Sequence, residues 1–192
     1  QLRTGNTGDN PFKKKEVRQA LYQAIDIEAI KKKVMRGLSE PAGIITFPGV
    51  NGYTTDLDKR LPYDVNAAKK LLADAGYPNG FDVELRCPND RYVNDEAICT
   101  AVVGMLGKIG VNVNLFAQTK SKHFKELKDN QGDFYMLGWG VPTLDSHYVF
   151  HYLYESGASW NKVNFSNSEV DAAIRVMEGE VDLDKRNAAI AK

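Results

Sequence analysis

Two histidines and an aspartate in the last third of the chain have the types and spacing that could bind a metal ion. His147 and His151 lie four residues apart, which places them on one face of a helix, and Asp145 precedes them. Zinc hydrolases use imidazole and carboxylate ligands of this kind. One hypothesis is therefore a metal-dependent hydrolase that uses these three residues. The alternative is that the pair faces solvent or forms local hydrogen bonds, because the stretch HYVFHYLY is strongly aromatic and offers no third strong ligand.

Other signatures of catalysis are missing from the sequence. It contains no G-x-S-x-G nucleophile elbow, no G-x-x-x-x-G-K-[ST] phosphate loop and no H-E-x-x-H zinc motif. The joint after the first predicted strand reads CPNDRYVND and has no glycine fingerprint for a dinucleotide. We therefore expect a protein that is not an enzyme, with no catalytic residues, no resident metal and no cofactor.

A tryptophan between two glycines is the strongest candidate for a binding residue. The stretch DFYMLGWG predicts a strand that ends at Trp139, with Tyr135 on the same face. Open α/β sheets bind ligands beyond the carboxyl ends of their strands, so Trp139 could form the wall of a pocket. The alternative is that its indole fills the core beneath the following loop. Gly138 and Gly140 favour the pocket, because a missing side chain lets a ligand approach closely.

The only two cysteines, Cys87 and Cys99, lie twelve residues apart. The first ends a predicted strand and the second lies in the predicted helix that follows. The spacing is not that of a C-x-x-C metal motif. A strand end and an adjacent helix could bring the two within bridging distance, which would imply an oxidising compartment. Two buried free thiols are equally compatible with the sequence.

The bulk composition is that of an ordinary globular protein. The 192 residues carry 25 basic and 25 acidic side chains, so no overall charge favours nucleic acid or an anionic membrane as a partner. No apolar run reaches the roughly 20 residues that span a bilayer, and no signal-peptide pattern opens the chain. The sequence begins without methionine and stops inside a helical pattern. We expect residues 1–192 to form one domain, excised from a longer protein.

The apolar periodicity predicts an α/β fold. In the centre of the chain, strands and helices alternate as β-α-β-α-β, and right-handed crossovers would place the helices on one face of a small sheet. Several further helices flank this unit, and Asp26, Asp64 and Asp182 are predicted to cap three of them. A long irregular connection covers residues 38–63. The central elements are expected at 81–87, 97–109, 111–116, 124–127 and 133–139.

Five segments, taken together and in order, resemble the family 5 extracellular solute-binding proteins, which bind dipeptides, oligopeptides or nickel for ABC importers. No single segment is diagnostic, but the resemblance covers nearly the whole chain. The segments are NPFKKKEVRQALYQAIDIEAI, YDVNAAKKLLADAGYPNGF, WGVPTLDSHYVFHYLY, NKVNFSNSEVDAAI and DLDKR.

The resemblance implies a lobe of a type II periplasmic binding protein. Such proteins are much longer than this chain and close two lobes on a small-molecule or peptide ligand, which they deliver to an ABC permease in the membrane. The resemblance further implies an exported monomer in the periplasm or outside the cell, with a lipid anchor in some intact proteins. Trp139 would be an apolar wall of the cleft, and the backbone of Gly140 and Val141 would offer hydrogen bonds beside Pro142.

One departure from the family pattern concerns the ligand. Pro142 stands where peptide-binding members carry an aspartate, three residues after the tryptophan, that pairs with the peptide ammonium group. An ammonium group buried without a carboxylate is costly. Asp145 matches a later family position, where we expect a helix-capping role. Peptides remain the first expectation, and the alternatives are a non-peptide solute such as a nickel chelate, or an interaction domain in which Trp139 is buried.

Overall fold

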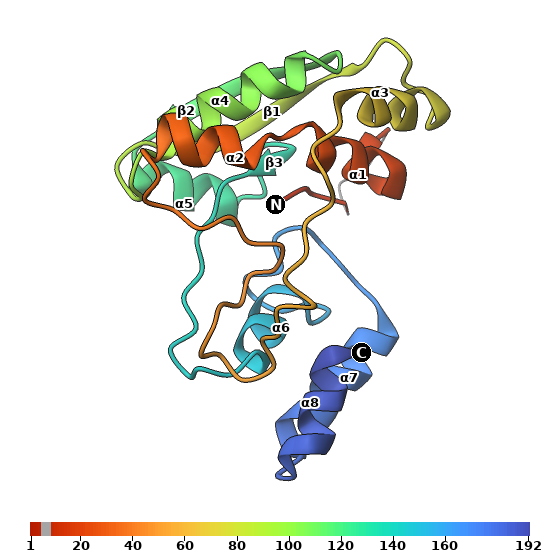
Figure 1. Ribbon diagram of the computed structural model, residues 1–192, viewed down its shortest axis with the longest axis vertical. Coiled ribbons are helices and arrows are strands. Elements are labelled where there is room, and N and C mark those ends of the chain that lie inside the picture. Colours follow the sequence, from red (N-terminus) through yellow and green to blue (C-terminus); the bar gives the residue numbers. More distant parts are fainter. Residues whose placement is uncertain (5–8) are drawn as a thin grey trace. The chain divides into compact units, whose positions relative to one another are not determined.

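The computed structural model describes residues 1–4 and 9–192, which gather into two compact units (Figure 1). Unit 1 comprises residues 1–41 and 61–138, and unit 2 comprises residues 42–60 and 139–192. Each unit has its own cluster of buried apolar side chains. The long irregular connection at 38–63 contributes residues to both units, and the single domain expected for residues 1–192 stays a prediction.

Unit 1 is built on a three-stranded parallel sheet in the order β2-β1-β3. The strands are β1 (Phe81–Pro88), β2 (Val111–Gln118) and β3 (Phe134–Tyr135). The first two confirm the prediction, and β1 pairs with β2 along its whole length. The third was predicted to continue to Trp139, but only two of its residues pair. Strand β3 lies at the edge of the sheet and ends early, so Trp139 follows it in an irregular segment.

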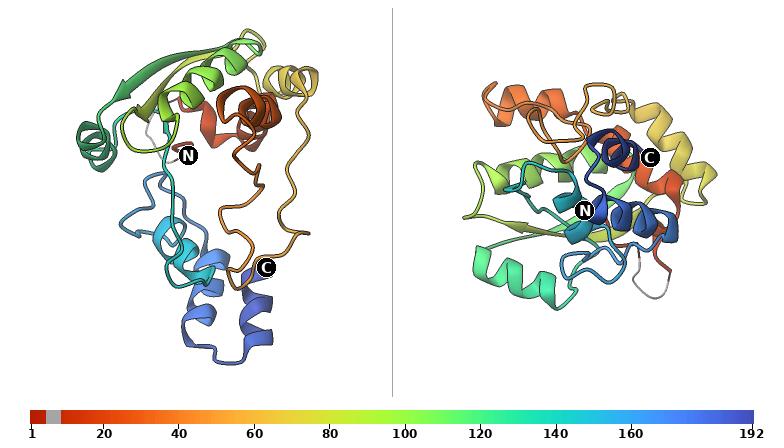
Figure 2. Two further views of the ribbon diagram at one scale, coloured as in Figure 1. Left: turned by 60° about the vertical axis from the view of Figure 1, so that its left-hand side comes forward. Right: turned by 90° about the horizontal axis from the view of Figure 1, so that it is seen from below.

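Helices cover both faces of this sheet. Because β2 and β3 lie on opposite sides of β1, right-handed crossovers place α4 and α5 on opposite faces (Figure 2). The expectation that the helices share one face was wrong. Right-handed crossovers place successive helices on one face only when the chain adds each new strand in the same direction along the sheet, and here β3 is added beyond β1 on the side opposite to β2. The helical elements of unit 1 are η1 (Pro11–Lys13), α1 (Lys15–Ala24), α2 (Ile27–Ala29), the π-helix η2 (Ile30–Val34), α3 (Val65–Asp74), α4 (Asp95–Gly107) and α5 (Lys120–Lys128).

The alternation of side chains along β1 agrees with this arrangement. Val83, Leu85 and Cys87 are buried in the apolar core that includes residues of α4. On the other face, the guanidinium of Arg86 lies 3.4 Å from the carboxylate of Glu126 in α5. The period of two in β1 therefore separates an apolar face from a face with a partly buried ion pair.

The three predicted helix caps are confirmed. Through a carboxylate oxygen, Asp26 accepts one backbone N–H group of the first helical turn, and Asp64 and Asp182 each accept two, at 2.9 to 3.1 Å. Each bond satisfies a donor that the helix itself leaves without a partner, which is typically worth about 1 kcal/mol.

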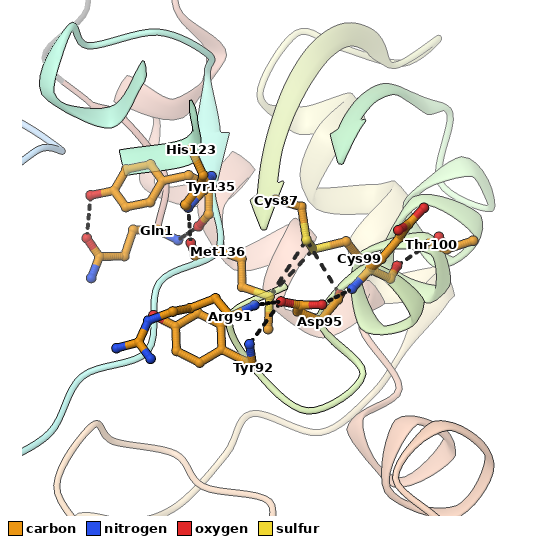
Figure 3. Close-up of a disulfide and its surroundings, with 11 residues drawn as sticks. Gln1, Cys87, Arg91, Tyr92, Asp95, Cys99, Thr100, His123, Tyr135 and Met136 are labelled. Carbon is orange, nitrogen blue, oxygen red and sulfur yellow. Dashed lines mark hydrogen bonds between the residues drawn. A yellow bond between two sulfur atoms is a disulfide. The ribbon is translucent and has the colours of Figure 1, made fainter. Parts of the chain in front are cut away.

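A disulfide between Cys87 and Cys99 joins β1 to α4 in the core of unit 1 (Figure 3). The sulfur of Met136 lies 3.8 Å and 3.6 Å from the two cysteine sulfurs. Beside the disulfide, Asp95 accepts the backbone N–H groups of Arg91 and Tyr92, each at 2.9 Å. Burial acts to raise the pKa of Asp95, but these backbone hydrogen bonds outweigh burial and hold the pKa below its usual value.

Unit 2 consists of three helices and the irregular segments around them. The helices are α6 (His147–Leu153), α7 (Ser168–Gly179) and α8 (Leu183–Ala191). Its buried core contains Val50 and Val141 from irregular segments and Val149 and Leu153 from α6. No helix in the described part of the chain is both long enough and apolar enough to cross a membrane.

Candidate functional site

Trp139 stands at the centre of a cluster of four aromatic rings in unit 2. Its ring centroid lies 6.0 Å from Tyr148, 6.1 Å from Tyr152 and 6.0 Å from Trp160. All four side chains are half-buried. We call these four residues the aromatic cluster. It combines packing against the core of unit 2 with ring surface that solvent can reach.

The sequence of α6 explains how the cluster is held. Tyr148 and Tyr152 are four residues apart, so their rings lie together on one face of the helix, 4.7 Å between centroids. Val149 and Leu153 repeat the same spacing one residue later and are buried in the core. The core-facing pair therefore fixes the orientation of the helix, and this orientation presents the tyrosines to Trp139.

The indole N–H of Trp139 is a donor that lacks an acceptor. Its Nε1 atom is buried and has no hydrogen-bond partner among the described residues. Buried indole N–H groups usually find a partner, and a donor left without one costs about 1–3 kcal/mol. Trp139 is thus neither sunk in the core nor fully exposed, and an acceptor placed at Nε1 would satisfy its only polar atom.

The two glycines beside Trp139 have different reasons to lack a side chain. A Cβ on Gly138 would lie 2.7 Å from the ring of Tyr92 in unit 1, whose hydroxyl accepts the N–H of Gly138 at 2.9 Å. A Cβ on Gly140 would meet no atom within 4 Å. The prediction that both glycines leave room for a ligand therefore keeps its structural basis only at Gly140.

The other predicted binding residues lie in different surroundings. Pro142 and Gly140 are exposed, whereas the side chain of Val141 is only 4% exposed and packs in the core of unit 2. Tyr135 belongs to unit 1, where it is 1% exposed and its hydroxyl donates to Oε1 of Gln1 at 2.6 Å (Figure 3). The phenol of Tyr135 is therefore already engaged inside unit 1.

Asp145 is a structural residue. Its carboxylate accepts two hydrogen bonds from the guanidinium of Arg186, at 2.9 and 3.0 Å, and one from the amide side chain of Asn51 at 3.1 Å. It also accepts the backbone N–H of His147, the first residue of α6, at 2.9 Å, although the N-cap residue of this helix is Ser146 and not Asp145 as expected. Burial acts to raise the pKa of Asp145, but the bonds from Arg186, His147 and Asn51 hold it below the usual value.

The structure therefore brings together two of the three residues named in the hydrolase hypothesis, His147 and His151, but not Asp145. Asp145 is paired with Arg186, and the carboxylate that faces His147 and His151 is that of Glu178 in α7. Sequence reasoning missed Glu178 because it lies 27 residues beyond His151 and follows no periodic pattern with it. It also missed Trp160, whose place beside Trp139 depends on the fold of an irregular segment.

Several residues that carry the family resemblance also hold the structure of unit 2. The side-chain amide of Asn161 donates to the carbonyls of Glu155 and Phe165 at 2.9 and 2.7 Å, and its oxygen accepts the N–H of Phe165 at 3.0 Å. Asn167 caps α7 by accepting the N–H groups of Glu169 and Val170. These motif positions therefore organise the turn between α6 and α7.

Unit 2 also contains an open hollow of about 600 Å³ away from the aromatic cluster. Its lining is largely aliphatic and includes Ile44, Ile45, Val149 and Ile190. The cluster around Trp139 remains the stronger candidate, because it combines partly exposed rings with an unsatisfied donor.

Comparison with solved structures defines the class of protein. The PBP AgaA from A. tumefaciens R10, solved with agropinic acid, superposes with a TM-score of 0.86 and 28% identity, over 99% of this chain and 39% of that one. A dipeptide-binding protein from Pseudoalteromonas sp. SM9913, solved with Met-Leu, gives a TM-score of 0.81 and 26% identity, over 99% and 38%. The chain therefore has the α/β fold of the type II periplasmic binding proteins.

Sequence comparison identifies the family. The family described as bacterial extracellular solute-binding proteins, family 5 Middle, matches residues 4–161, and the chain belongs to this family. Heme-binding protein A of Haemophilus influenzae is 30% identical over 189 residues, which are 94% of this chain and 34% of the relative. The dipeptide-binding protein of Escherichia coli K12 is 30% identical over 164 residues, 84% of this chain and 30% of the relative. The chain thus spans about a third of the length of these relatives.

Proposed function

We propose that the chain is part of the substrate-binding component of an ABC importer, which binds a peptide or similar small solute in a cleft between lobes and delivers it to a membrane permease. Membership of family 5 supports this proposal. So do relatives named for binding heme, dipeptides and glutathione. The protein would act by binding and release, with no chemical step.

The proposed location is the periplasm or the cell exterior, in keeping with a family described as extracellular solute-binding proteins. The disulfide between Cys87 and Cys99 supports this location, because disulfides persist mainly in oxidising compartments.

The observation that carries the proposal is the environment of the Trp139 side chain. Its ring is half-buried within the aromatic cluster, and its buried N–H has no partner among the described residues. A solute that places a carbonyl or carboxylate oxygen at Nε1 would satisfy this donor, and its apolar part would lie against the rings. The open side of Gly140 would let the solute approach the backbone at this point.

The same surroundings bear on the kind of solute. Pro142 provides no carboxylate for an ammonium group, and the carboxylate of Asp145 is engaged by Arg186. At this surface the solute would therefore present an acceptor or an apolar face. Among solutes of this kind, we propose a peptide as the first candidate and a non-peptide solute such as a nickel chelate as the second.

Calorimetric titration tests the proposal. Short peptides, glutathione and metal chelates would be titrated into the purified protein, and the tightest solute into the Trp139→Phe variant. This variant keeps an aromatic ring but loses the N–H, so we expect about fivefold weaker binding, since a hydrogen bond contributes about 1 kcal/mol.

Tyr63→Phe is the matched control, because Tyr63 is an exposed aromatic residue of unit 1 and this variant also keeps an aromatic ring while it loses a hydrogen-bond donor. It should bind like the wild type. Equal affinity of wild type and Trp139→Phe would contradict the role of Trp139, and the absence of binding for every class of solute would contradict the proposed function.

A further inference from the structure

Two helices of unit 2 bring together three side chains that could hold a metal ion. His147 and His151 extend from α6 and Glu178 extends from α7. Nε2 of His147 and Nδ1 of His151 each lie 3.6 Å from Oε1 of Glu178. The two imidazole rings are stacked, with centroids 5.5 Å apart and planes 20° from parallel. The two rings therefore present one nitrogen each to the same carboxylate oxygen.

These two nitrogen atoms lie within ion-pair distance of carboxylates but make no hydrogen bond with the described residues. Both atoms are buried. The carboxylate of Glu155 comes within 2.7 Å of Nδ1 of His151, but the angles there do not make a hydrogen bond. Because buried polar atoms are nearly always paired, two such nitrogen atoms that face the same carboxylate oxygen are well placed to bind a cation together with it.

The distances suit a transition metal in tetrahedral coordination. Zinc binds histidine nitrogen at about 2.0–2.1 Å and carboxylate oxygen at about 2.0–2.2 Å, so neighbouring ligand atoms lie roughly 3.4 Å apart. The two separations of 3.6 Å are close to this value, and all three ligand atoms lie within 4.8 Å of one another. The side chain of Glu178 is 44% exposed, which leaves it free to make the small adjustment that coordination requires.

We propose that His147, His151 and Glu178 form a binding site for one divalent transition-metal ion of the zinc type. The ion ties α6 to α7, and its fourth position is taken by water or by the carboxylate of Glu155. Two imidazoles and one carboxylate are a ligand set that zinc accepts. The site contains neither Trp139 nor Asp145, so it does not depend on the proposed solute-binding role.

Zinc titration of the purified protein tests the proposal, after removal of any affinity tag and treatment with a chelator. We expect one zinc ion per chain by native mass spectrometry, a Kd in the micromolar range or tighter, and a higher Tm with saturating zinc. His147→Ala/His151→Ala should weaken binding by at least about 100-fold, and Glu178→Gln by about 10-fold.

Glu169→Gln is the matched control for Glu178→Gln. Glu169 is an exposed residue in the first turn of the same helix, and the variant makes the same change of charge away from the histidines. It should bind zinc like the wild type. His123, the third histidine of the sequence, is unchanged in every variant and is fully buried in unit 1. Zinc that a variant still binds is therefore not attributed to His123.

Two results would overturn the proposal. One is the absence of saturable zinc binding to the wild type, and the other is equal zinc affinity of the wild type and the double histidine variant. Glu178→Gln provides a second test if the double variant does not fold, because it alters an exposed side chain. Its solute affinity should match that of the wild type, which separates the metal site from solute binding.

Discussion

Reduction of the disulfide between Cys87 and Cys99 should measurably destabilise unit 1. The two cysteines are twelve residues apart in the chain, and both are buried in the core between β1 and α4. A crosslink stabilises a protein mainly because it restricts the unfolded chain, by an amount that depends on the length of the closed loop. For a loop of about 12 residues the entropy relation gives about 3 kcal/mol at 25 °C.

Urea unfolding of the oxidised protein and of the protein in a reducing agent, followed by circular dichroism, measures this difference. We expect the free energy of unfolding to fall by about 3 kcal/mol on reduction. The Cys87→Ala/Cys99→Ala variant controls for the reducing agent and should unfold alike with and without it. Unfolding of the oxidised and reduced wild type at the same urea concentration would refute the reasoning, as would a thiol assay that finds both cysteines free in the native protein.

Three further predictions concern stability. Asp145→Asn should lower the free energy of unfolding of unit 2 by about 2–3 kcal/mol in denaturant titration, because it leaves the mostly buried Arg186 without its charged partner. The pKa of Asp145 is lowered in the folded protein, so the stabilisation by its ionised carboxylate is fully present above about pH 4 and is lost as the pH falls further. Unfolding followed during acid titration should therefore show a smaller loss of stability for Asp145→Asn than for the wild type. Gly80→Ala should cost at least about 2 kcal/mol, because φ is +76° and a Cβ would lie 1.8 Å from the carbonyl oxygen of Gly110, whereas Gly104→Ala, inside α4 with open space around it, should be neutral or stabilising by about 0.5–1 kcal/mol.

The local signals in the sequence predicted most of unit 1. Aspartates before apolar periodic segments marked helix starts at Asp26 and Asp64, because capping requires only contacts within one turn. The alternation of apolar and polar residues, strict in VNVNLF, located β1 and β2, because successive side chains of a strand point to opposite faces. The length of β3 depended on distant partners. Its position at the edge of the sheet, beside Leu2 at the start of the chain, is not encoded in its own residues.

The candidate site was less predictable because it depends on contacts between segments. The four-residue spacing of Tyr148 and Tyr152 is a local signal that could have placed two rings on one helical face. The approach of Trp160 to Trp139, however, follows from the turn that Asn161 organises. Asp145 pairs with Arg186, which lies 41 positions further along the chain. The sequence alone therefore gave no reason to exclude Asp145 as a metal ligand.

The central claim is that a solute contacts the indole of Trp139, and the protein contains only two tryptophans, Trp139 and Trp160. Trp160→Phe therefore leaves Trp139 as the sole tryptophan, and acrylamide quenching of its fluorescence reports how accessible that ring is. The account predicts that a saturating solute shields Trp139 and lowers the quenching constant several-fold. A quenching constant that stays the same when the bound solute is present would contradict it.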